Sequence, residues 1–254
     1  MTLNRIDDAL VQHWLTPDWT VPDRVRAYVT TRAGSLSAHP YDGFNTASHV
    51  GDDPGHVEAN RQSLAEYFDW SREPQWLKQV HGIEAIEARG DGIEREGDAV
   101  VTREPGQVCT LHTADCLPVF FASQQGDVVG LAHAGWRGLA NGVLESTLEK
   151  MDVAPAQVQV WLGPAISQEA FEVGDDVRDA FLALDPAAES CFHLNLRDRW
   201  QCSLYGLARQ RLRAAGVQQI TGGDHCTFSD TRFFSYRRQS VTGRMLAMIW
   251  IEPE

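Results

Sequence analysis

The sequence predicts a protein of mixed α and β structure that forms one domain. Short apolar runs, separated by Gly, Pro and Asp, fill the middle third of the chain and indicate strands. Segments with apolar residues spaced for one helical face lie before and after these runs. The 254 residues suffice for one large core, and no repeat, low-complexity tract or obvious linker divides them. We therefore expect a single domain over residues 1–254, with residues 1–20 as an N-terminal extension.

The first third begins with a strand and continues into a helix. Residues 25–31 (VRAYVTT) indicate the strand, and the loop after it, residues 32–45, is dense in Gly, Ser, Pro and Asn. A loop of this length can line a site as well as turn the chain. Asp53 followed by Pro54 is typical of a helix start, because the Asp side chain caps free amides and Pro fits the first turn. Arg61 falls on the apolar face of this helix, where a long stem covering the core edge is the usual arrangement.

The middle third is expected to supply most of the sheet. Its apolar runs are residues 75–80, 83–88, 98–102, 107–113, 117–123 and 127–133. After His133, residues 138–151 place apolar side chains on one helical face, so this helix should pack on the sheet. The remaining elements are two buried strands, at residues 158–166 and 244–251, and two helices, at residues 175–184 and 199–216.

Composition excludes several classes of function. The formal net charge of −13 argues against nonspecific binding to nucleic acid or to an anionic membrane surface. The amino terminus lacks the order of a secretory signal, and no apolar run is long enough to span a membrane. Five cysteines without paired spacing favour a reducing cytoplasm over a disulfide framework. No pattern specifies an oligomeric state, and a monomer is compatible with the composition.

Three residues are candidates to bind one metal ion. His81, Cys116 and His133 each lie at or just after an apolar run, where a strand end holds a side chain rigidly. Two imidazoles and one thiolate suit zinc. Three protein ligands leave an open position for water or substrate, which distinguishes catalytic zinc from structural zinc. This open position is the reason to expect an enzyme.

Each of these residues also has a simpler structural interpretation. A lone buried histidine is usually a hydrogen-bonded core residue, and a lone cysteine is usually a small hydrophobe. Gly82 after His81 favours a site because it allows a close approach of backbone or ligand. Asp115 beside Cys116 favours one because an acid is costly to bury without a partner.

A small zinc module built from Cys109, His112 and Cys116 is a weaker interpretation. Cys109 and His112 point to opposite faces of an extended strand. No second ligand pair stands at the spacing of a zinc finger. We therefore set this module aside.

Short segments along the chain resemble the YfiH-like family, whose members are also called laccase-domain proteins, polyphenol oxidases or purine nucleoside phosphorylases. In chain order they are TTRAG, NTASHVGDD, QVHG, TADCLPV, HAGWRG, WLGPAI, FFSYRR and TGR, and they run from about Thr30 to Ile251. The resemblance implies a layered α/β sandwich with mixed sheets flanked by helices, and zinc at His81, Cys116 and His133. It also implies phosphorolysis of adenosine, inosine and methylthioadenosine, and hydrolytic deamination of adenosine.

Deamination needs an activated water and a group that moves a proton. Zinc in such a site can lower the pKa of bound water towards about 7, which provides a hydroxide able to attack C6 of the purine. Asp115 is the nearest carboxylate in sequence to move the proton, although a strand neighbour of Cys116 is expected to point away from the ion. The H-x-E and P-C-x-x-C motifs that nucleic-acid deaminases combine do not occur together, because the sequence has no P-C-x-x-C.

Phosphorolysis needs a bound phosphate near the ribose and contacts to the nucleoside. Arginine holds phosphate through bidentate hydrogen bonds, and the candidates are Arg32, Arg137 and Arg237 with its neighbour Arg238. Asn45 is a candidate to hydrogen-bond a sugar or base edge. The aromatic side chains of FFSYRR are candidates to stack on the purine, although aromatics at such spacing are more often part of a core.

Three other functions fit part of the pattern. A copper polyphenol oxidase would also use two His and one Cys, but no Met follows Cys116 closely and no His-x-His pair is present for a multicopper cluster. A cysteine-type amide hydrolase would use Cys116 as nucleophile with His133 or His81 as base, and the family's link to peptidoglycan-precursor quality control suits that chemistry. A zinc-stabilised binding module is disfavoured by the open coordination position.

Overall fold

The computed structural model of the protein describes residues 6–34 and 36–253. Its helices and strands, in chain order, are α1 (Asp8–Val11), β1 (Val25–Val29), α2 (Pro54–Tyr67), β2 (Leu77–Lys78), β3 (Ala85–Glu87), β4 (Arg95–Glu96), β5 (Ala99–Thr102), β6 (Cys109–Thr113), β7 (Leu117–Ser123), β8 (Val129–Ala134), α3 (Trp136–Asn141), α4 (Val143–Met151), β9 (Val158–Leu162), β10 (Glu172–Val173), α5 (Asp175–Leu182), β11 (Phe192–Leu194), β12 (Trp200–Cys202), α6 (Leu204–Ala214), β13 (Gln219–Gly222) and β14 (Met245–Ile251).

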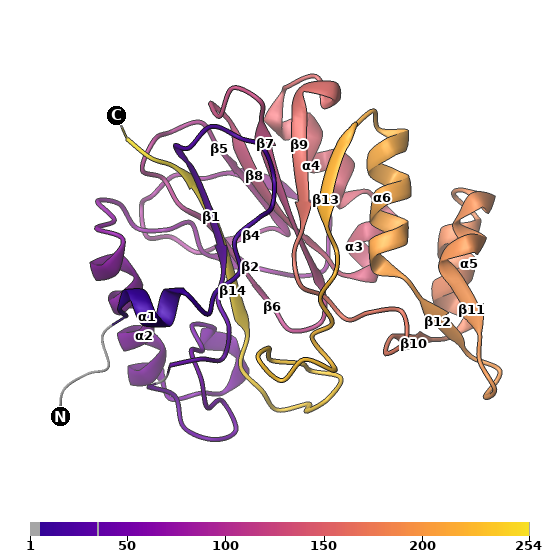
Figure 1. The fold of residues 1–254 in the computed structure, drawn as a ribbon, viewed down its shortest axis with the longest axis horizontal. Coiled ribbons are helices and arrows are strands. Elements are labelled where there is room, and N and C mark those ends of the chain that lie inside the picture. The colour runs from indigo at the N-terminus through magenta and orange to yellow at the C-terminus, as the bar shows by residue number, and fades with distance from the viewer. Residues whose placement is uncertain (1–5, 35, 254) are drawn as a thin grey trace.

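Two sheets form the centre of the molecule. The larger has the strand order β13-β9-β7-β8-β5-β3, and the smaller has the order β1-β14-β6. In the larger sheet β13 runs parallel to β9 and β3 parallel to β5, whereas its other neighbours are antiparallel. The expected mixed α/β fold is therefore confirmed. Figure 1 shows α2 beside the smaller sheet on one side and α3 and α6 beside the larger sheet on the other.

Alternation of side chains along the strands produces these layers. On β7, Val119 and Phe121 point into the cluster packed by α3, α4 and α6. Phe120 and Ala122, on the opposite face of β7, fill the space between the two sheets. All seven residues of β7 are buried, as expected for a strand covered on both faces.

A third apolar cluster lies on the outer face of the smaller sheet. Trp250 of β14 and Leu64 of α2 are buried in it. Ile6 and Trp14 are also buried there, so the described part of the expected extension at residues 1–20 packs on the core. Residues 1–5 of that extension lie outside the described part of the chain.

Most expected elements are present, and two differ. The helix expected at residues 138–151 is divided into α3 and α4 because Gly142 adopts a left-handed conformation with φ of 108°. The helix expected at residues 199–216 begins instead with strand β12, which pairs with β10 and β11. Ser203 then caps α6 by accepting a hydrogen bond from the Gly206 amide. Strand pairing decided the second of these corrections. The helix start at Asp53 is confirmed, since its side chain accepts from two backbone amides of α2.

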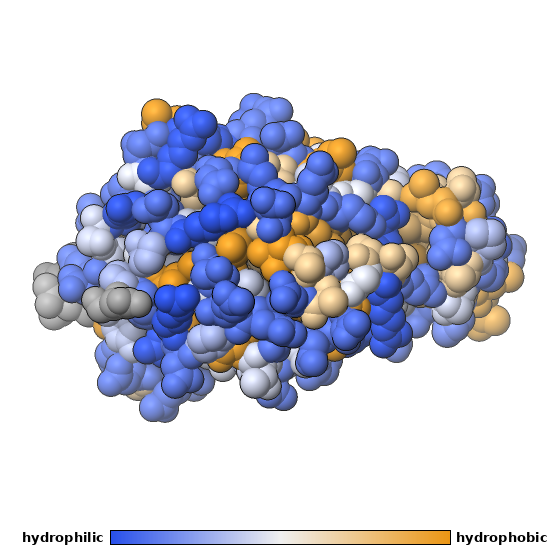
Figure 2. All heavy atoms as spheres, turned by 90° about the horizontal axis from the view of Figure 1, so that it is seen from above, coloured by the Kyte–Doolittle hydropathy of each residue, from blue (hydrophilic) through white to orange (hydrophobic). Residues whose placement is uncertain are grey.

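The surface is largely hydrophilic when seen from above in Figure 2. Apolar side chains gather near its middle and at the end that carries α5, β11 and β12. Among the described residues, the exposed leucines are Leu184, Leu194 and Leu196. In the part of the chain that the structure describes, no helix has the length and apolarity needed to cross a membrane.

Candidate metal centre

His81, Cys116 and His133 meet at one end of the larger sheet. His133 lies near the end of β8, and Cys116 immediately precedes the neighbouring strand β7. The antiparallel register pairs Pro118 with His133, so the start of β7 lies beside the end of β8. The ligand atoms of the three residues all lie within 4.8 Å of one another, and Cys116 Sγ is 3.9 Å from His81 Nε2. One ion can therefore contact all three side chains, and this donor set suits zinc.

The buried carboxylate of Asp98 holds both histidines in place. His133 Nδ1 donates a hydrogen bond of 2.8 Å to Asp98 Oδ1, which leaves His133 Nε2 free to bind a metal. The same carboxylate accepts hydrogen bonds from the backbone amides of Val80, His81 and Gly82. These bonds fix a turn in which His81 has a φ of 61°, a strained value for a residue with a side chain.

Sequence reasoning did not identify Asp98 as a site residue. Burial opposes its charge, but hydrogen bonds and charge from His133 and backbone donors outweigh that effect and lower its pKa. The available signal was an aspartate that directly precedes a fully buried strand, β5. A charged residue in that position needs several partners.

Electrostatics favour an ionised thiol at Cys116. Burial alone would raise the pKa of Cys116, but the charge of His133 and hydrogen bonds with His133 and His81 lower it to about 6. Burial would lower the pKa of His133, whereas the charge of Cys116 and the Asp98 carboxylate raise it to about 9. The Cys116 sulfur and the His133 imidazole therefore each stabilise the charged form of the other. The thiolate is also the form of cysteine that binds metals.

Glycines of the HAGWRG segment make room for the centre. A Cβ at Gly135 would lie 2.9 Å from His81 Cδ2 and 3.1 Å from Cys116 Sγ. A Cβ at Gly138 would lie 2.8 Å from the carbonyl oxygen of Gly82. Both positions therefore need glycine for the close approach of α3 and the segment before it to the turn that carries His81.

The three residues line a cavity of about 480 Å³. It is lined by His49, Gln79, His81, His112, Thr113, Ala114, Asp115, Cys116, His133, Trp136, Arg137, Ile166, Phe171, Leu204, Tyr236, Arg237 and Arg244. One wall is apolar and comes from the cluster around α3 and α6, with Trp136, Phe171 and Leu204. A polar wall comes from the smaller sheet and its connections, with His112 and Arg244. A ligand with one aromatic and one polar end fits such a cavity.

Arg137 and Arg237 line the cavity, as the sequence suggested, and both are exposed. The Arg137 guanidinium lies 4.3 Å from the ring centroid of Trp136. Arg237 Nη1 donates to the carbonyl oxygen of Glu172, and its guanidinium lies 5.3 Å from the ring of Phe171. Both cations therefore lie beside the apolar wall.

Asp115 also lines the cavity, but its carboxylate is already occupied. Oδ1 accepts a hydrogen bond from Thr227 Oγ1, and Oδ2 accepts one from the backbone amide of Arg237, each at 2.6 Å. The backbone of Asp115 is strained, with a φ of 95°. This side chain thus joins the turn before Cys116 to the segment that carries Arg237.

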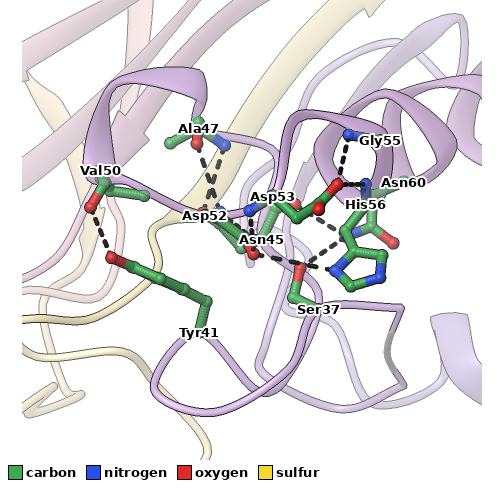
Figure 3. A network of polar contacts seen from close by, with 10 residues as sticks. All are labelled: Ser37, Tyr41, Asn45, Ala47, Val50, Asp52, Asp53, Gly55, His56 and Asn60. Carbon is green, nitrogen blue, oxygen red and sulfur yellow. Dashed lines mark hydrogen bonds and ion pairs between the residues drawn. The ribbon is translucent and has the colours of Figure 1, made fainter.

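The structure does not bring Arg32 or Asn45 to the cavity. Arg32 lines a separate surface hollow and forms an ion pair with Asp42. Asn45 is fully buried, where its Nδ2 donates to Asp52 and its Oδ1 accepts from Ala47 (Figure 3). The backbone amide of Arg244 donates to the same oxygen of Asn45.

Several cavity residues were missed from the sequence. His49 and Arg244 lie in the NTASHVGDD and TGR segments, where nothing marks them as facing a site. For His112 the sequence suggests only a small zinc module with Cys109. Cys109 points into the core between the two sheets, whereas His112, on the opposite face of β6 as strand geometry predicts, lines the cavity. The contributing strands are distant in sequence, so only their pairing reveals this grouping.

Together, the layered fold and the His-Cys-His cluster define a class of α/β sandwich proteins with a candidate metal centre at a sheet end. The family model described as multi-copper polyphenol oxidoreductase laccase matches residues 26–252. The chain belongs to this family. Its resemblance to the YfiH-like proteins is thereby confirmed.

Relatives and solved structures agree with this assignment. A Pseudomonas aeruginosa protein named purine nucleoside phosphorylase is 50% identical over 241 residues, which cover 94% of this chain and 98% of the relative. The Escherichia coli purine nucleoside phosphorylase YfiH is 46% identical, with 93% and 98% covered. A crystal structure of a Neisseria meningitidis protein matches with a TM-score of 0.91 and 41% identity, and the match covers 95% of this chain and 100% of that protein. YlmD from Geobacillus stearothermophilus has a TM-score of 0.85 and 31% identity, covering 94% and 96%.

Proposed function

We propose that this protein is a zinc-dependent purine nucleoside phosphorylase that acts on adenosine, inosine and methylthioadenosine and also deaminates adenosine. The observation that carries the proposal is the meeting of His81, Cys116 and His133 in a cavity with an aromatic wall and several arginines. Relatives that are 50% and 46% identical are named purine nucleoside phosphorylase. A cytoplasmic location belongs to the proposal, since all five cysteines are unpaired.

His81, Cys116 and His133 are the residues that would hold the zinc ion. When bound there, the ion would supply Lewis acidity and activate water beside the substrate. Zinc is favoured over copper because a multicopper oxidase needs further histidine clusters. Within residues 6–34 and 36–253, these three form the one group of at least three His, Cys or acidic side chains arranged to hold a metal.

The nucleoside is proposed to lie with its base against the apolar wall. Trp136 and Phe171 offer aromatic surface for the purine, and Arg137 and Arg237 lie beside these two rings. Tyr236, which is 56% exposed, lines the same cavity and can cover the other face of a base. This placement directs the ribose toward the polar wall.

Phosphorolysis then exchanges one bond for another at the ribose. A phosphate oxygen forms a bond to C1′ while the bond from C1′ to the purine nitrogen breaks, and the bonding electrons leave with the base, which takes up a proton. In deamination, water supplies the oxygen that replaces the amino group at C6, and ammonia leaves. Asp98 keeps the proton of His133 on Nδ1, so Nε2 stays available at the centre.

Asp115 is proposed to act by positioning rather than by moving a proton. Both of its oxygens accept hydrogen bonds from protein donors. It thereby fixes the turn before Cys116 relative to the loop of Arg237. Asp115→Asn should raise the KM for nucleoside more than it lowers kcat, whereas a proton carrier would lose kcat and show an altered pH profile.

A cysteine-dependent amide hydrolase is the second candidate. The favouring observation is the series Cys116, His133 and Asp98, in which a carboxylate orients the imidazole next to a thiol. Such an enzyme would work without metal. Activity that survives complete removal of metal by a chelator would therefore support the hydrolase over the zinc enzyme.

The first test combines metal content with turnover of adenosine. Purified protein should contain nearly one zinc per chain, release adenine only with phosphate, and release inosine without it. Cys116→Ala should lose both metal and turnover while the circular dichroism spectrum is retained. Cys226→Ser, outside the cluster, is the matched control. Turnover by metal-free Cys116→Ala would disprove the zinc mechanism, and stoichiometric zinc without nucleoside turnover would disprove the substrate assignment.

A further inference from the structure

The polar wall of the cavity carries positive charge without a carboxylate partner. Arg244 directly precedes β14 and is half-buried. Its Nη1 donates to the carbonyl oxygens of Thr242 and Gly243, and in the described part of the chain no carboxylate forms an ion pair with it. A half-buried guanidinium that faces a cavity without an ion-paired carboxylate favours an anionic ligand.

Hydrogen-bonding groups of β6 lie beside this arginine. In the antiparallel pairing of β14 with β6, Met245 stands opposite Thr113, so Arg244 continues just beyond Thr113. Thr113 is 1% exposed and lines the cavity, yet its Oγ1 has no hydrogen-bond partner. A buried hydroxyl without a partner is energetically costly unless a ligand or a water molecule forms a hydrogen bond with it.

Two histidines lie in the same corner of the cavity as Arg244 and Thr113. The rings of His49 and His112 are 6.0 Å apart, and both residues line the cavity. His112 Nε2 is hydrogen-bonded with Thr46 Oγ1. His49 and Arg244 line the same cavity, and burial, followed by the charge of Arg244, lowers the pKa of His49.

Asn45 holds the corner together. Its Oδ1 accepts hydrogen bonds from the backbone amides of Ala47 and Arg244. The first bond fixes the start of the short turn that carries His49, and the second fixes the start of β14. The residue that the sequence suggested as a direct substrate ligand thus has a positioning role.

We propose that Arg244, Thr113, His49 and His112 form an oxyanion subsite that binds the phosphate used in phosphorolysis. This subsite deepens the proposed function and takes the identity of its ligand from it. Phosphate must reach C1′ on the side opposite the departing purine. The rim cations Arg137 and Arg237 lie beside Trp136 and Phe171, which are proposed to hold the base. Arg244 instead directly precedes β14, and its guanidinium lies 5.8 Å from the ring centroid of Tyr236.

The test measures binding of inorganic phosphate to the metal-containing protein by titration calorimetry. Arg244→Gln should weaken binding at least about tenfold, since it removes a charged, bidentate donor. Thr113→Val, which keeps the shape of the side chain, should weaken binding about threefold through loss of one hydrogen bond. Arg72→Gln is the control, because Arg72 pairs with Glu104 outside the cavity.

Comparison with the rim arginines makes the assignment specific. Arg137→Gln and Arg237→Gln should change phosphate affinity less than about twofold and act on the KM for nucleoside instead. The proposal is overturned if folded Arg244→Gln binds phosphate like the wild type, or if binding is lost in a rim variant. If Arg244→Gln does not fold, the Thr113→Val result decides.

Failure of this subsite is distinguishable from failure of the proposed function. If Arg244→Gln carries out phosphorolysis with an unchanged KM for phosphate, the proposed subsite is wrong and the proposed function stands. If phosphate binding depends on Arg244 but the protein cleaves no nucleoside, the subsite stands and the proposed function is wrong.

Discussion

Asp98 and His133 form a buried pair in which the imidazole Nδ1 lies 2.8 Å from the carboxylate oxygen. The same carboxylate accepts three backbone amides from the turn that carries His81. One side chain therefore orients two of the three candidate metal ligands. Cooperation of this kind makes a metal site sensitive to a residue that does not contact the ion.

Asp98→Asn should weaken zinc binding by roughly 10- to 100-fold. The amide keeps the size of the side chain but cannot accept all four hydrogen bonds, because its nitrogen is a donor. Competition with a chromophoric chelator measures the affinity. Asp152→Asn, at the end of α4, is the control and should bind zinc like the wild type. Equal affinity in Asp98→Asn would show that the carboxylate does not orient the histidines.

Gly135→Ala should damage the centre while leaving the fold intact. The added methyl group would stand 2.9 Å from the His81 ring and 3.1 Å from the Cys116 sulfur. Overpacking of about 1–3 kcal/mol corresponds to roughly 5- to 150-fold in affinity. Zinc content after dialysis is the measurement. Gly55→Ala is the comparison, since its methyl group meets only the Asp53 carboxylate, and neither residue lines the cavity. Full zinc retention by Gly135→Ala would contradict this account of the glycine.

His112 should make the protein less stable at mildly acidic pH. Burial, followed by the charges of Arg61 and His49, lowers the pKa of His112 well below its usual value. Below pH about 6.5, His112 of the unfolded chain therefore binds a proton that His112 of the folded protein does not take up. Proton binding stabilises the unfolded state, so the free energy of unfolding decreases as the pH falls. Between pH 7 and 5.5 the loss is about 1 kcal/mol.

Urea denaturation of the wild type and His112→Gln at both pH values tests this expectation. The variant lacks the titrating group. Its unfolding free energy, relative to that of the wild type, should therefore be about 1 kcal/mol higher at pH 5.5 than at pH 7. A difference that does not change with pH would mean that His112 is protonated in the folded protein.

Tyr236→Ala should raise the KM for adenosine by roughly tenfold, since base stacking contributes about 1–3 kcal/mol. The side chain is 56% exposed, so the free energy of unfolding should change by less than about 0.5 kcal/mol. Steady-state kinetics provide the measurement. Tyr236→Phe keeps the ring and should behave like the wild type, and a loss of affinity in this variant would indicate a role for the hydroxyl instead.

The sequence by itself determined the local structure and the candidate ligands. Nearly continuous apolar runs specify β7 and β14, because a strand covered on both faces must be apolar on both. Asp53 caps α2 with its own side chain, so this helix start depends only on neighbouring residues. Histidine and cysteine at strand ends indicated a metal site because few side chains bind metals in this way.

Tertiary structure decided which distant residues share the cavity. Asp98 and His133 are 35 positions apart and meet through the pairing of β5 with β8. Arg244 and Thr113 line the same cavity because the register of β14 on β6 pairs Met245 with Thr113. The same kind of pairing made residues 200–202 a strand, whereas their local pattern suggested a helix. Strand register depends on the whole packed core, so no local pattern contains it.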